Sequence, residues 1–315
     1  MYSEPEADFI PLRPLPDKGT IGVVAPSSPV EQDRLERGVA YLKNLGYQVV
    51  VGESCYAKDT YLAGSDALRA NDLMHLIDDD TIDAIFCARG GFGSMRILKM
   101  LDYELIAEKR KLIVGYSDIT ALHWAIFAQT GLPGISAGMV ASDFGKETVD
   151  PFFEKWFWPL VRQGKMQISL PAQDTRPHKT IGTALSGTIS VASKLLGSEY
   201  FPRIADPIYI FEDVEEPMHK LEGYFQQFVL SGAFDQCEGV VLGSFTPATK
   251  ESYNEVPTQQ EMFDRIFRGV RASILSGLDY GHIPAKMAVP VGMPIELETT
   301  QNGTTLTLAG NPFKS

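Results

Sequence analysis

The alternation of short apolar runs with amphipathic segments in the first 130 residues is the feature that most constrains the fold. Residues 20–25 form a β-branched apolar run, a turn-forming Pro-Ser-Ser-Pro follows, and apolar residues then recur at helical spacing as far as Gly46. The same pattern predicts further strands at 47–51, 82–88 and 111–114, and further helices at 66–77, from Ser94 and at 118–130. Strands that alternate with helices form a parallel sheet covered by helices, and such sheets bind ligands at the carboxyl ends of their strands.

Residues 145–182 interrupt this alternation with two tryptophans, several prolines and a polar stretch. Beyond them, we expect a strand at 207–211, a helix from Met218 to Gly232, a strand at 239–243, and an antiparallel hairpin with its turn at Asn302-Gly303. A chain of 315 residues is about twice the size of a typical domain of ~150 residues. The sequence therefore predicts two domains: an α/β N-terminal domain at 1–165, a linker at 166–182, and a mixed α/β C-terminal domain at 183–315.

The net charge of −12 disfavours phosphate backbones and anionic membranes as general partners. The longest stretch without charged residues, 119–142, contains polar residues and a Gly-Leu-Pro-Gly break, so it does not meet the criterion of ~18 continuous apolar residues for a membrane span. Residues 1–9 carry three acidic side chains where a secretory signal would carry basic ones, so they do not resemble such a signal. Three cysteines without a C-x-x-C pair suggest neither a disulfide framework nor a cysteine zinc site. We expect a cytoplasmic protein that binds neither nucleic acid nor membranes.

The sharpest local motif lies where the predicted strand 111–114 turns directly into the next helix. Its sequence, Gly115-Tyr116-Ser117-Asp118, resembles a nucleophile elbow, in which the serine Oγ is exposed at the sheet edge and helix amides face a developing oxyanion. The motif has only one glycine where the full G-x-S-x-G pattern has two. Alternatively, Ser117 or Asp118 serves only as the N-cap of the helix.

A glycine-rich segment, Arg89-Gly90-Gly91-Phe92-Gly93-Ser94, follows the predicted strand 82–88. Glycines let backbone N–H groups approach a ligand closely. The segment lacks the third glycine of a dinucleotide fingerprint and the Lys-Ser/Thr of a phosphate loop, so an anion cradle or an oxyanion hole fits it better than a nucleotide site. The alternative is a tight turn that requires positive φ.

Two further residues complete a set that is able to catalyse acyl transfer. Glu212 follows the predicted strand 207–211, and His282 lies between a glycine and a proline in Gly281-His282-Ile283-Pro284, where a histidine has little packing role. Together with Ser117, they supply a nucleophile, an orienting acid and a general base in the order Ser, acid, His. His123 falls inside the predicted helix 118–130, where we expect a packed histidine.

A zinc site is the rival hypothesis for one of these residues. His219 and Glu222 have the H-x-x-E spacing that holds zinc on a helix when a third ligand, here His282, comes from elsewhere. This spacing also arises readily by chance, and a surface ion pair is the simpler interpretation. We therefore predict no metal and no cofactor.

Several of these segments together resemble the LD-carboxypeptidases, or murein tetrapeptidases, a family of serine peptidases that includes the microcin immunity peptidases. The matching pieces occur in the family's order: GTIGVVAPSS at 19–28, ARGGFGSMRIL at 88–98, IVGYSDITALH at 113–123, IFEDVEE at 210–216, GVVLGSF at 239–245, and GHIP followed by PVG within 281–292. The match spans most of residues 19–310.

The resemblance implies a flavodoxin-like N-terminal sheet domain, a C-terminal domain with a barrel-like sheet, a site between them, and commonly a homodimer. It places the nucleophile on Ser117, the acid on Glu212, the base on His282, and the oxyanion hole at the amides near Gly91 and Asp118. The implied substrate is a murein tetrapeptide from peptidoglycan recycling, cut before its terminal D-Ala. Arg89 is then the nearest cation for the terminal carboxylate of the substrate, although it equally fits a structural ion pair.

Two segments depart from the family pattern. Residues 135–139, Ile-Ser-Ala-Gly-Met, replace a T-x-H-G-P stretch, and residues 187–191, Gly-Thr-Ile-Ser-Val, replace G-G-N-L. Phe92 also stands where tyrosine is commoner. These departures keep two alternatives open: a related peptidase that acts on a peptidyl-nucleotide or another acyl-peptide, and a catalytically silent protein that binds muropeptides.

Overall fold

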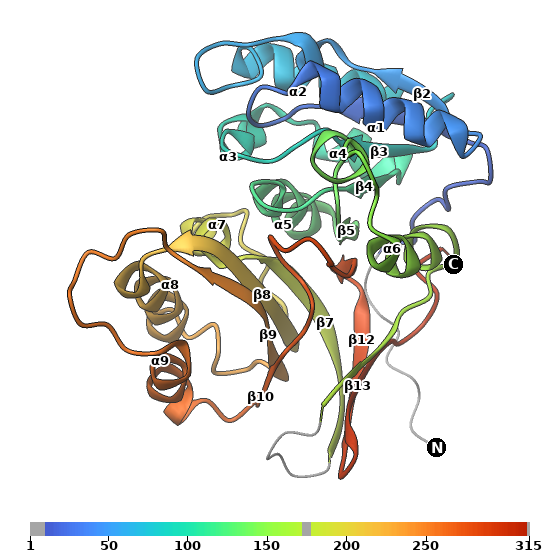
Figure 1. The fold of residues 1–315 in the computed structure, drawn as a ribbon. Coiled ribbons are helices and arrows are strands. Elements are labelled where there is room, and N and C mark those ends of the chain that lie inside the picture. The colour runs from blue at the N-terminus through green and yellow to red at the C-terminus, as the bar shows by residue number, and fades with distance from the viewer. Residues whose placement is uncertain (1–9, 172–177, 314–315) are drawn as a thin grey trace.

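The predicted alternation forms a six-stranded sheet in the computed structural model, which describes residues 10–171 and 178–313 (Figure 1). Its strands are β1 (Thr20–Val24), β2 (Gln48–Val51), β3 (Ala84–Cys87), β4 (Leu112–Val114), β5 (Gly134–Ser136) and β11 (Val289–Val291). The strand order is β11-β5-β4-β3-β1-β2, and β1 to β5 are parallel. The order 2-1-3-4-5 is that of flavodoxin-like sheets, so the predicted class of the first sheet is confirmed.

Helices cover this sheet. They are α1 (Gln32–Asn44), α2 (Asp66–Asp78), α3 (Ser94–Ile97), α4 (Tyr103–Lys109), α5 (Ile119–Thr130) and α6 (Pro151–Gln163), with shorter turns η1 (Glu53–Tyr56), η2 (Leu98–Met100) and η3 (Val140–Phe144). Helices α1 to α5 lie in the connections between the parallel strands, and α6 follows the last of these strands, β5. Ser65, Asp102 and Asp150 accept backbone N–H groups at the N-termini of α2, α4 and α6. The helix expected from Ser94 is a single α-helical turn followed by a 3₁₀ turn.

Helix α5 explains the long charge-free stretch of the sequence. Its residues from Ile119 to Phe127 are all buried, since it lies between the first sheet and the second, where it contacts β5, β7 and β11. The indole of Trp124 donates a hydrogen bond to the Ser186 carbonyl of β7 at 2.9 Å. A helix that is apolar on all sides is stable only when it is buried in this way.

No helix in the described ranges has the length and apolar character to cross a membrane.

The second sheet has seven strands in the order β10-β9-β8-β7-β12-β13-β6. They are β6 (Gln167–Leu170), β7 (His178–Thr188), β8 (Pro207–Glu216), β9 (Gly239–Pro247), β10 (Ser273–Ser276), β12 (Pro294–Thr300) and β13 (Gly303–Leu308). Strands β7 to β10 are parallel, whereas β12, β13 and β6 continue the sheet in antiparallel pairs. The C-terminal part is therefore mixed α/β, as predicted.

Helices pack on one side of the parallel half of this sheet (Figure 1). They are α7 (Ile189–Ala192), α8 (Met218–Leu230) and α9 (Gln259–Ile266), with the turns η4 (Ser193–Leu195) and η5 (Phe267–Gly269). The apolar side of α8 that the spacing predicts is buried through Leu221, Phe225 and Phe228. Phe228 packs against Phe211 of β8 with ring centroids 4.9 Å apart.

The chain crosses between the two sheets more than once. Residues 166–182, expected as a linker, contain β6 and the start of β7, both of which are strands of the second sheet. Later in the chain, β11 returns to pair with β5 of the first sheet. Residues 172–177 of the expected linker and residues 1–9, where no secretory signal was expected, lie outside the described residues. The exact domain boundaries stay a prediction.

The C-terminal hairpin forms, but its turn lies one residue earlier than predicted. Thr300 pairs with Gly303, so the two turn residues are Gln301 and Asn302. Gly303 is the first residue of β13 and has a φ of 141°, a conformation that glycine adopts without a steric cost.

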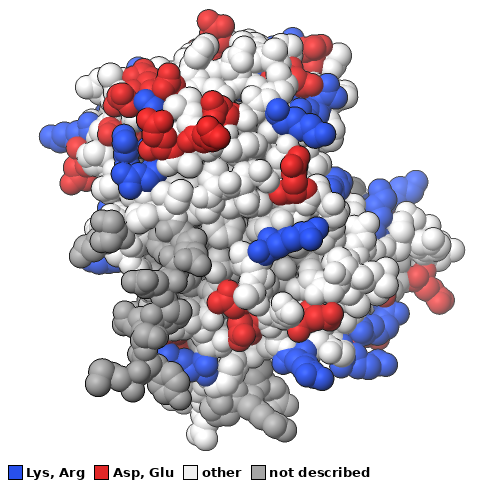
Figure 2. All heavy atoms as spheres, turned by 180° about the vertical axis from the view of Figure 1, so that it is seen from behind, with Lys and Arg blue, Asp and Glu red and all other residues white. Residues whose placement is uncertain are grey.

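Charged side chains of both signs are interspersed on the face shown in Figure 2, and its described residues form no continuous basic tract.

Candidate active site

The first part of the site is the turn between β4 and α5. Ser117 has a φ of 67°, in the left-handed region that side-chain-bearing residues rarely adopt. The N-cap position of α5 is occupied by Asp118, and no side-chain hydrogen bond caps the helix. Asp118 is thus the N-cap residue that the alternative expected, although its side chain does not cap the helix. A strained serine between a strand and a helix has the backbone of a nucleophile elbow.

The glycine-rich segment after β3 packs directly against this serine. A Cβ on Gly90 would lie 2.8 Å from Ser117 Cβ and 3.0 Å from its Oγ, which is closer than atoms of this kind approach. Gly91 has a φ of 112°, and a Cβ there would overlap Ser28. Gly91 therefore has the positive φ that the tight-turn alternative expects, and Gly90 lets the backbone lie close to Ser117; the oxyanion hole stays a prediction.

Asp118 joins three loops at the carboxyl edge of the first sheet. Its buried carboxylate accepts hydrogen bonds from the Ser27 hydroxyl at 2.6 Å and from the Ser94 amide at 2.8 Å, while its carbonyl accepts the Ser94 hydroxyl at 2.6 Å. Ser27 follows β1, Ser94 follows β3, and Asp118 follows β4. These bonds hold the loops around Ser117 in a fixed arrangement.

Glu212 comes from the second sheet. The strand predicted at 207–211 runs on to Glu216, so Glu212 lies inside β8 rather than at its end. The register between β8 and β9 shifts between Phe211 and Asp213, and both Glu212 and Asp213 are buried. Such irregularities re-aim side chains and are frequent beside active sites. Here the irregularity lies where two neighbouring carboxylates are buried.

Each of these carboxylates has its own hydrogen-bond donors. Glu212 Oε1 accepts the Thr188 hydroxyl, and Asp213 Oδ2 accepts the Ser190 amide at 2.7 Å. Burial, and then the neighbouring Glu212 carboxylate, raise the pKa of Asp213 to about 6. Thr188 and Ser190 belong to the segment that departs from the family pattern, so this departure supplies partners for both acids.

His282 lies between Glu212 and Ser117. Its Nδ1 is 2.7 Å from Glu212 Oε2 and its Nε2 is 3.0 Å from Ser117 Oγ. The His282 amide also donates to Glu212 Oε2 at 3.2 Å. A Cβ on Gly281, whose φ is 131°, would lie 2.7 Å from Glu212 Oε2, so this glycine permits the contact. The structure therefore brings Ser117, His282 and Glu212 into one hydrogen-bonded chain.

Arg89 lies beside the glycine-rich segment. Its Nη1 donates a hydrogen bond to the Pro29 carbonyl at 2.9 Å, and its Nη2 is 3.7 Å from where a Cβ of Gly91 would be. Arg89 is partly buried and directly precedes the glycine-rich segment, which contacts Ser117 through Gly90. Binding of a substrate carboxylate by Arg89 stays a prediction.

The residues of the zinc hypothesis are used in other contacts. His219 packs edge-on against Tyr253, Glu222 pairs with Arg265 at 3.5 Å, and His282 belongs to the chain described above. Within residues 10–171 and 178–313, no three His, Cys, Asp or Glu residues are grouped so as to hold a metal ion.

His123 is a packed histidine, as expected. It is 3% exposed, and its Nε2 is 3.0 Å from the Gly115 carbonyl. Burial lowers its pKa to about 4, so it is uncharged at neutral pH. Its contact with the Gly115 carbonyl places it against the backbone of the elbow.

The sequence did not predict two residues that support the site without belonging to the hydrogen-bonded set Ser117, His282 and Glu212. Thr188 donates to Glu212. Arg69, buried on α2, donates to the carbonyls of Pro26 and Gly93 and so connects the loops after β1 and β3. Neither belongs to a motif, because each acts through a partner that is distant in the sequence.

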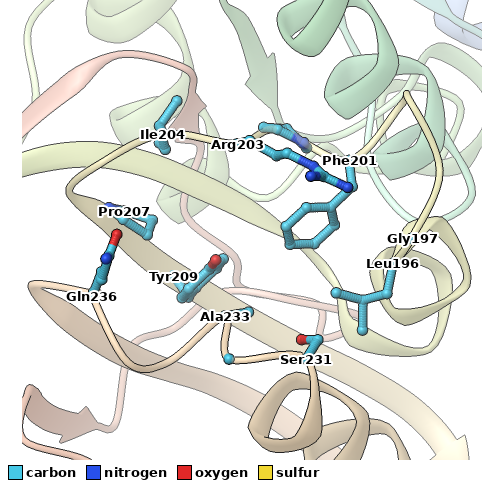
Figure 3. Close-up of a pocket in the computed structure, with 12 residues that line it drawn as sticks. Leu196, Gly197, Phe201, Arg203, Ile204, Pro207, Tyr209, Ser231, Ala233 and Gln236 are labelled. Atoms are coloured by element: carbon cyan, nitrogen blue, oxygen red, sulfur yellow. The ribbon is translucent and has the colours of Figure 1, made fainter.

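A cavity of about 330 Å³ lies beside the first residues of β8, where Pro207 and Tyr209 line it (Figure 3). Phe201, Tyr209 and Leu196 line it, with Arg203 at its edge. None of the three residues of the hydrogen-bonded chain lines this cavity, so it is separate from the candidate active site.

Comparison with known families identifies the class of this protein. Residues 21–137 match the LD-carboxypeptidase N-terminal domain, and residues 181–297 match the LD-carboxypeptidase C-terminal domain. The two matches contain Ser117, Glu212 and His282. The chain belongs to the LD-carboxypeptidase family of peptidases.

Individual relatives match over nearly their whole length. A Bacillus subtilis protein named as a probable murein peptide carboxypeptidase is 30% identical, covering 90% of this chain and 89% of its own. The microcin C7 self-immunity protein MccF of Escherichia coli is 26% identical, covering 91% and 92%. The crystal structure of muramoyltetrapeptide carboxypeptidase from Oxalobacter formigenes has the same fold, with a TM-score of 0.85 at 24% identity, covering 93% and 99%.

Proposed function

We propose that this protein is a serine carboxypeptidase of LD type that removes the C-terminal D-amino acid, D-Ala, from a murein tetrapeptide. The observation that carries the proposal is the chain Ser117, His282 and Glu212, in which the base lies 3.0 Å from the nucleophile and 2.7 Å from the acid. These are the separations at which a general base takes a proton and an acid orients the base.

In this mechanism, His282 Nε2 accepts the proton of Ser117 Oγ as the oxygen attacks the scissile carbonyl. Glu212 holds the ring through Nδ1 and stabilises the imidazolium that forms. His282 then returns the proton to the leaving amine. Water, activated by the same histidine, hydrolyses the acyl-enzyme and restores Ser117.

Backbone amides near Gly91 and Asp118 act as the oxyanion hole. The support is that the glycine-rich segment lies against Ser117, while Asp118 begins the helix that follows it. Preorganised N–H donors at this position stabilise the tetrahedral intermediate without reorganisation.

Arg89 binds the terminal carboxylate of the substrate and thereby restricts cleavage to the last residue. The support is that Arg89 Nη2 lies 3.7 Å from where a Cβ of Gly91 would be, on the segment whose Gly90 contacts Ser117. With the wild type, amidating the C-terminus of a good tetrapeptide should raise KM or abolish cleavage, because the amide lacks the charge that Arg89 pairs with. Arg89→Ala should erase most of this discrimination. Equal hydrolysis of acid and amide by the wild type would leave a less specific amidase or endopeptidase.

We further propose that the protein acts in the cytoplasm, in peptidoglycan recycling, as a homodimer and without a cofactor. A related activity on a peptidyl-nucleotide or another acyl-peptide is the second candidate, and the similarity to MccF over most of both chains favours it. A third candidate is a silent muropeptide-binding protein, motivated by the departures at 135–139 and 187–191.

The decisive experiment is mass spectrometry of a panel of muropeptides, acyl-peptides and peptidyl-nucleotides after incubation with the purified protein. We expect loss of a single C-terminal residue from tetrapeptides ending in D-Ala. Cleavage of peptidyl-nucleotides alone would select the second candidate, whereas binding without any cleavage would select the third.

A further inference from the structure

A buried lysine on the loop of His282 contacts the residue next to Ser117. The Lys286 side chain is 5% exposed, and its Nζ donates hydrogen bonds to the Tyr116 hydroxyl at 2.7 Å and to Asp143 Oδ1 at 2.8 Å. A buried ammonium is costly unless it is paired and hydrogen-bonded. The two contacts therefore provide the interactions that this lysine needs inside the protein.

The carboxylate that binds Lys286 is itself fixed to the backbone. Asp143 is 4% exposed, lies on η3, and accepts the Met139 amide through Oδ2 at 2.9 Å. A second lysine, Lys146, reaches the same Oδ1 at 3.5 Å, but its side chain is 34% exposed. Two lysines therefore contact the Asp143 carboxylate, and of these two Lys286 is the one that also binds Tyr116.

Tyr116 connects this ion pair to the candidate active site. It directly precedes Ser117, and its ring centroid is 4.9 Å from that of His282, with the two planes tilted by 53°. Burial raises the pKa of Tyr116 well above its usual value, so the hydroxyl that Lys286 binds is uncharged. The tyrosine ring forms one wall of the space that the imidazole occupies.

The loop that carries His282 and Lys286 crosses from one sheet to the other. Residues 277–288 leave β10 of the second sheet and enter β11 of the first, and the structure shows no helix or strand within this segment. His282 lies in the middle of this crossing. Glu212 fixes the imidazole from the second sheet, whereas Lys286 attaches the same loop to η3 and to the elbow.

We propose that Lys286 is a positioning residue for the reaction: by bonding Tyr116 and Asp143, it fixes the tyrosine ring against His282 and so holds the imidazole in line with Ser117 Oγ. This inference rests on the proposed function. Displacing a base by about 1 Å is expected to lower a rate by about 10²-fold, so a loop attachment of this kind has a measurable effect on kcat.

The test compares the steady-state kinetics of Lys286→Met, Tyr116→Phe and the matched control Lys146→Met on a cleavable tetrapeptide. We expect Lys286→Met to lower kcat by about 10- to 100-fold with KM within about twofold, because positioning affects the chemical step and not ground-state binding. Tyr116→Phe should lower kcat in the same direction, and it keeps the ring, so it should fold. Lys146→Met should behave as the wild type. Equal kcat values for the two lysine variants would overturn the inference.

A second comparison separates positioning from stability. Lys286→Met leaves the Asp143 carboxylate buried without its main partner, which destabilises a fold. The double variant Lys286→Met/Asp143→Asn removes both charges and should recover thermal stability. We expect its kcat to stay as low as that of Lys286→Met. Recovery of kcat together with Tm would show a purely structural role and overturn the inference.

Ser117→Ala distinguishes failure of the inference from failure of the proposed function. If Ser117→Ala cleaves as well as the wild type, the proposed function is wrong. If Ser117→Ala is inactive while Lys286→Met is as active as Lys146→Met, only the role of Lys286 is wrong.

Discussion

The two sides of the candidate active site are built by different means. On the first sheet, Ser117 is fixed by its backbone: a φ of 67°, contact with Gly90, and the helix that starts at Asp118. On the second sheet, Glu212 and His282 are fixed by side-chain hydrogen bonds from Thr188 and to each other. A small substitution on the first side should therefore lower the rate by steric overlap, whereas one on the second side should lower it by removing a hydrogen bond.

Removing the base should have the largest effect. His282→Ala is expected to lower kcat/KM by about 10⁴-fold, because the serine then lacks a proton acceptor while the oxyanion hole remains. The measurement is release of the C-terminal residue by mass spectrometry. His123→Ala is not a matched control because that residue is buried, so the exposed His75→Ala serves instead and should retain activity. Comparable rates for His75→Ala and His282→Ala would contradict the assigned base.

A methyl group on the nucleophile side should act sterically. Gly90→Ala places a Cβ 2.8 Å from Ser117 Cβ, so either the serine or the glycine segment must move. We expect kcat to fall by about 10²-fold, since small misplacements of a nucleophile are costly. Gly223→Ala is the control because a Cβ there meets no atom within 4 Å. Unchanged kcat in Gly90→Ala would show that the elbow is not tightly constrained.

On the acid side, the loss of one hydrogen bond should have a smaller effect. Thr188→Val keeps the shape of the side chain but removes the hydroxyl that donates to Glu212 Oε1. We expect kcat to fall by about tenfold, corresponding to about 1.4 kcal/mol. Thr183→Val on the same strand is the control. An effect as large as that of Gly90→Ala would remove the proposed difference between the two sides.

The smallest effect concerns stability. Because the pKa of Asp213 is raised to about 6 in the folded protein, the folded state retains this proton at pH values where the unfolded state has released it. Its contribution to stability is therefore present at low pH and is lost as pH rises from about 4 to about 6. Between these pH values, the free energy of unfolding should fall with pH at a slope that corresponds to about one proton. Urea unfolding should show that Asp213→Asn removes this fall. Parallel pH profiles of wild type and variant would contradict the raised pKa.

The nucleophile side was largely predictable from the sequence, since its determinants are local. The alternation of strands and helices predicts a parallel sheet, the resemblance implies its flavodoxin-like arrangement, and the elbow occupies seven consecutive residues from Leu112 to Asp118. Strand β11 was not predicted because it joins the first sheet only through pairing with β5, far earlier in the chain.

The acid was predicted at the end of a strand and the base in a loop, but the groups that surround them were not predicted. The bond between Thr188 and Glu212 depends on the parallel pairing of β7 with β8, where these two residues are register partners. The contact of Lys286 with Tyr116 joins residues 170 positions apart. Periodicity within one segment carries no information on such pairings.

The most direct test of the account is the rate at which wild type and Ser117→Ala release D-Ala from the same murein tetrapeptide. The account predicts that the wild type releases one D-Ala per tetrapeptide and that Ser117→Ala is slower by about 10⁴-fold or more, with an unchanged thermal unfolding midpoint. Release of D-Ala by Ser117→Ala at the wild-type rate would contradict it.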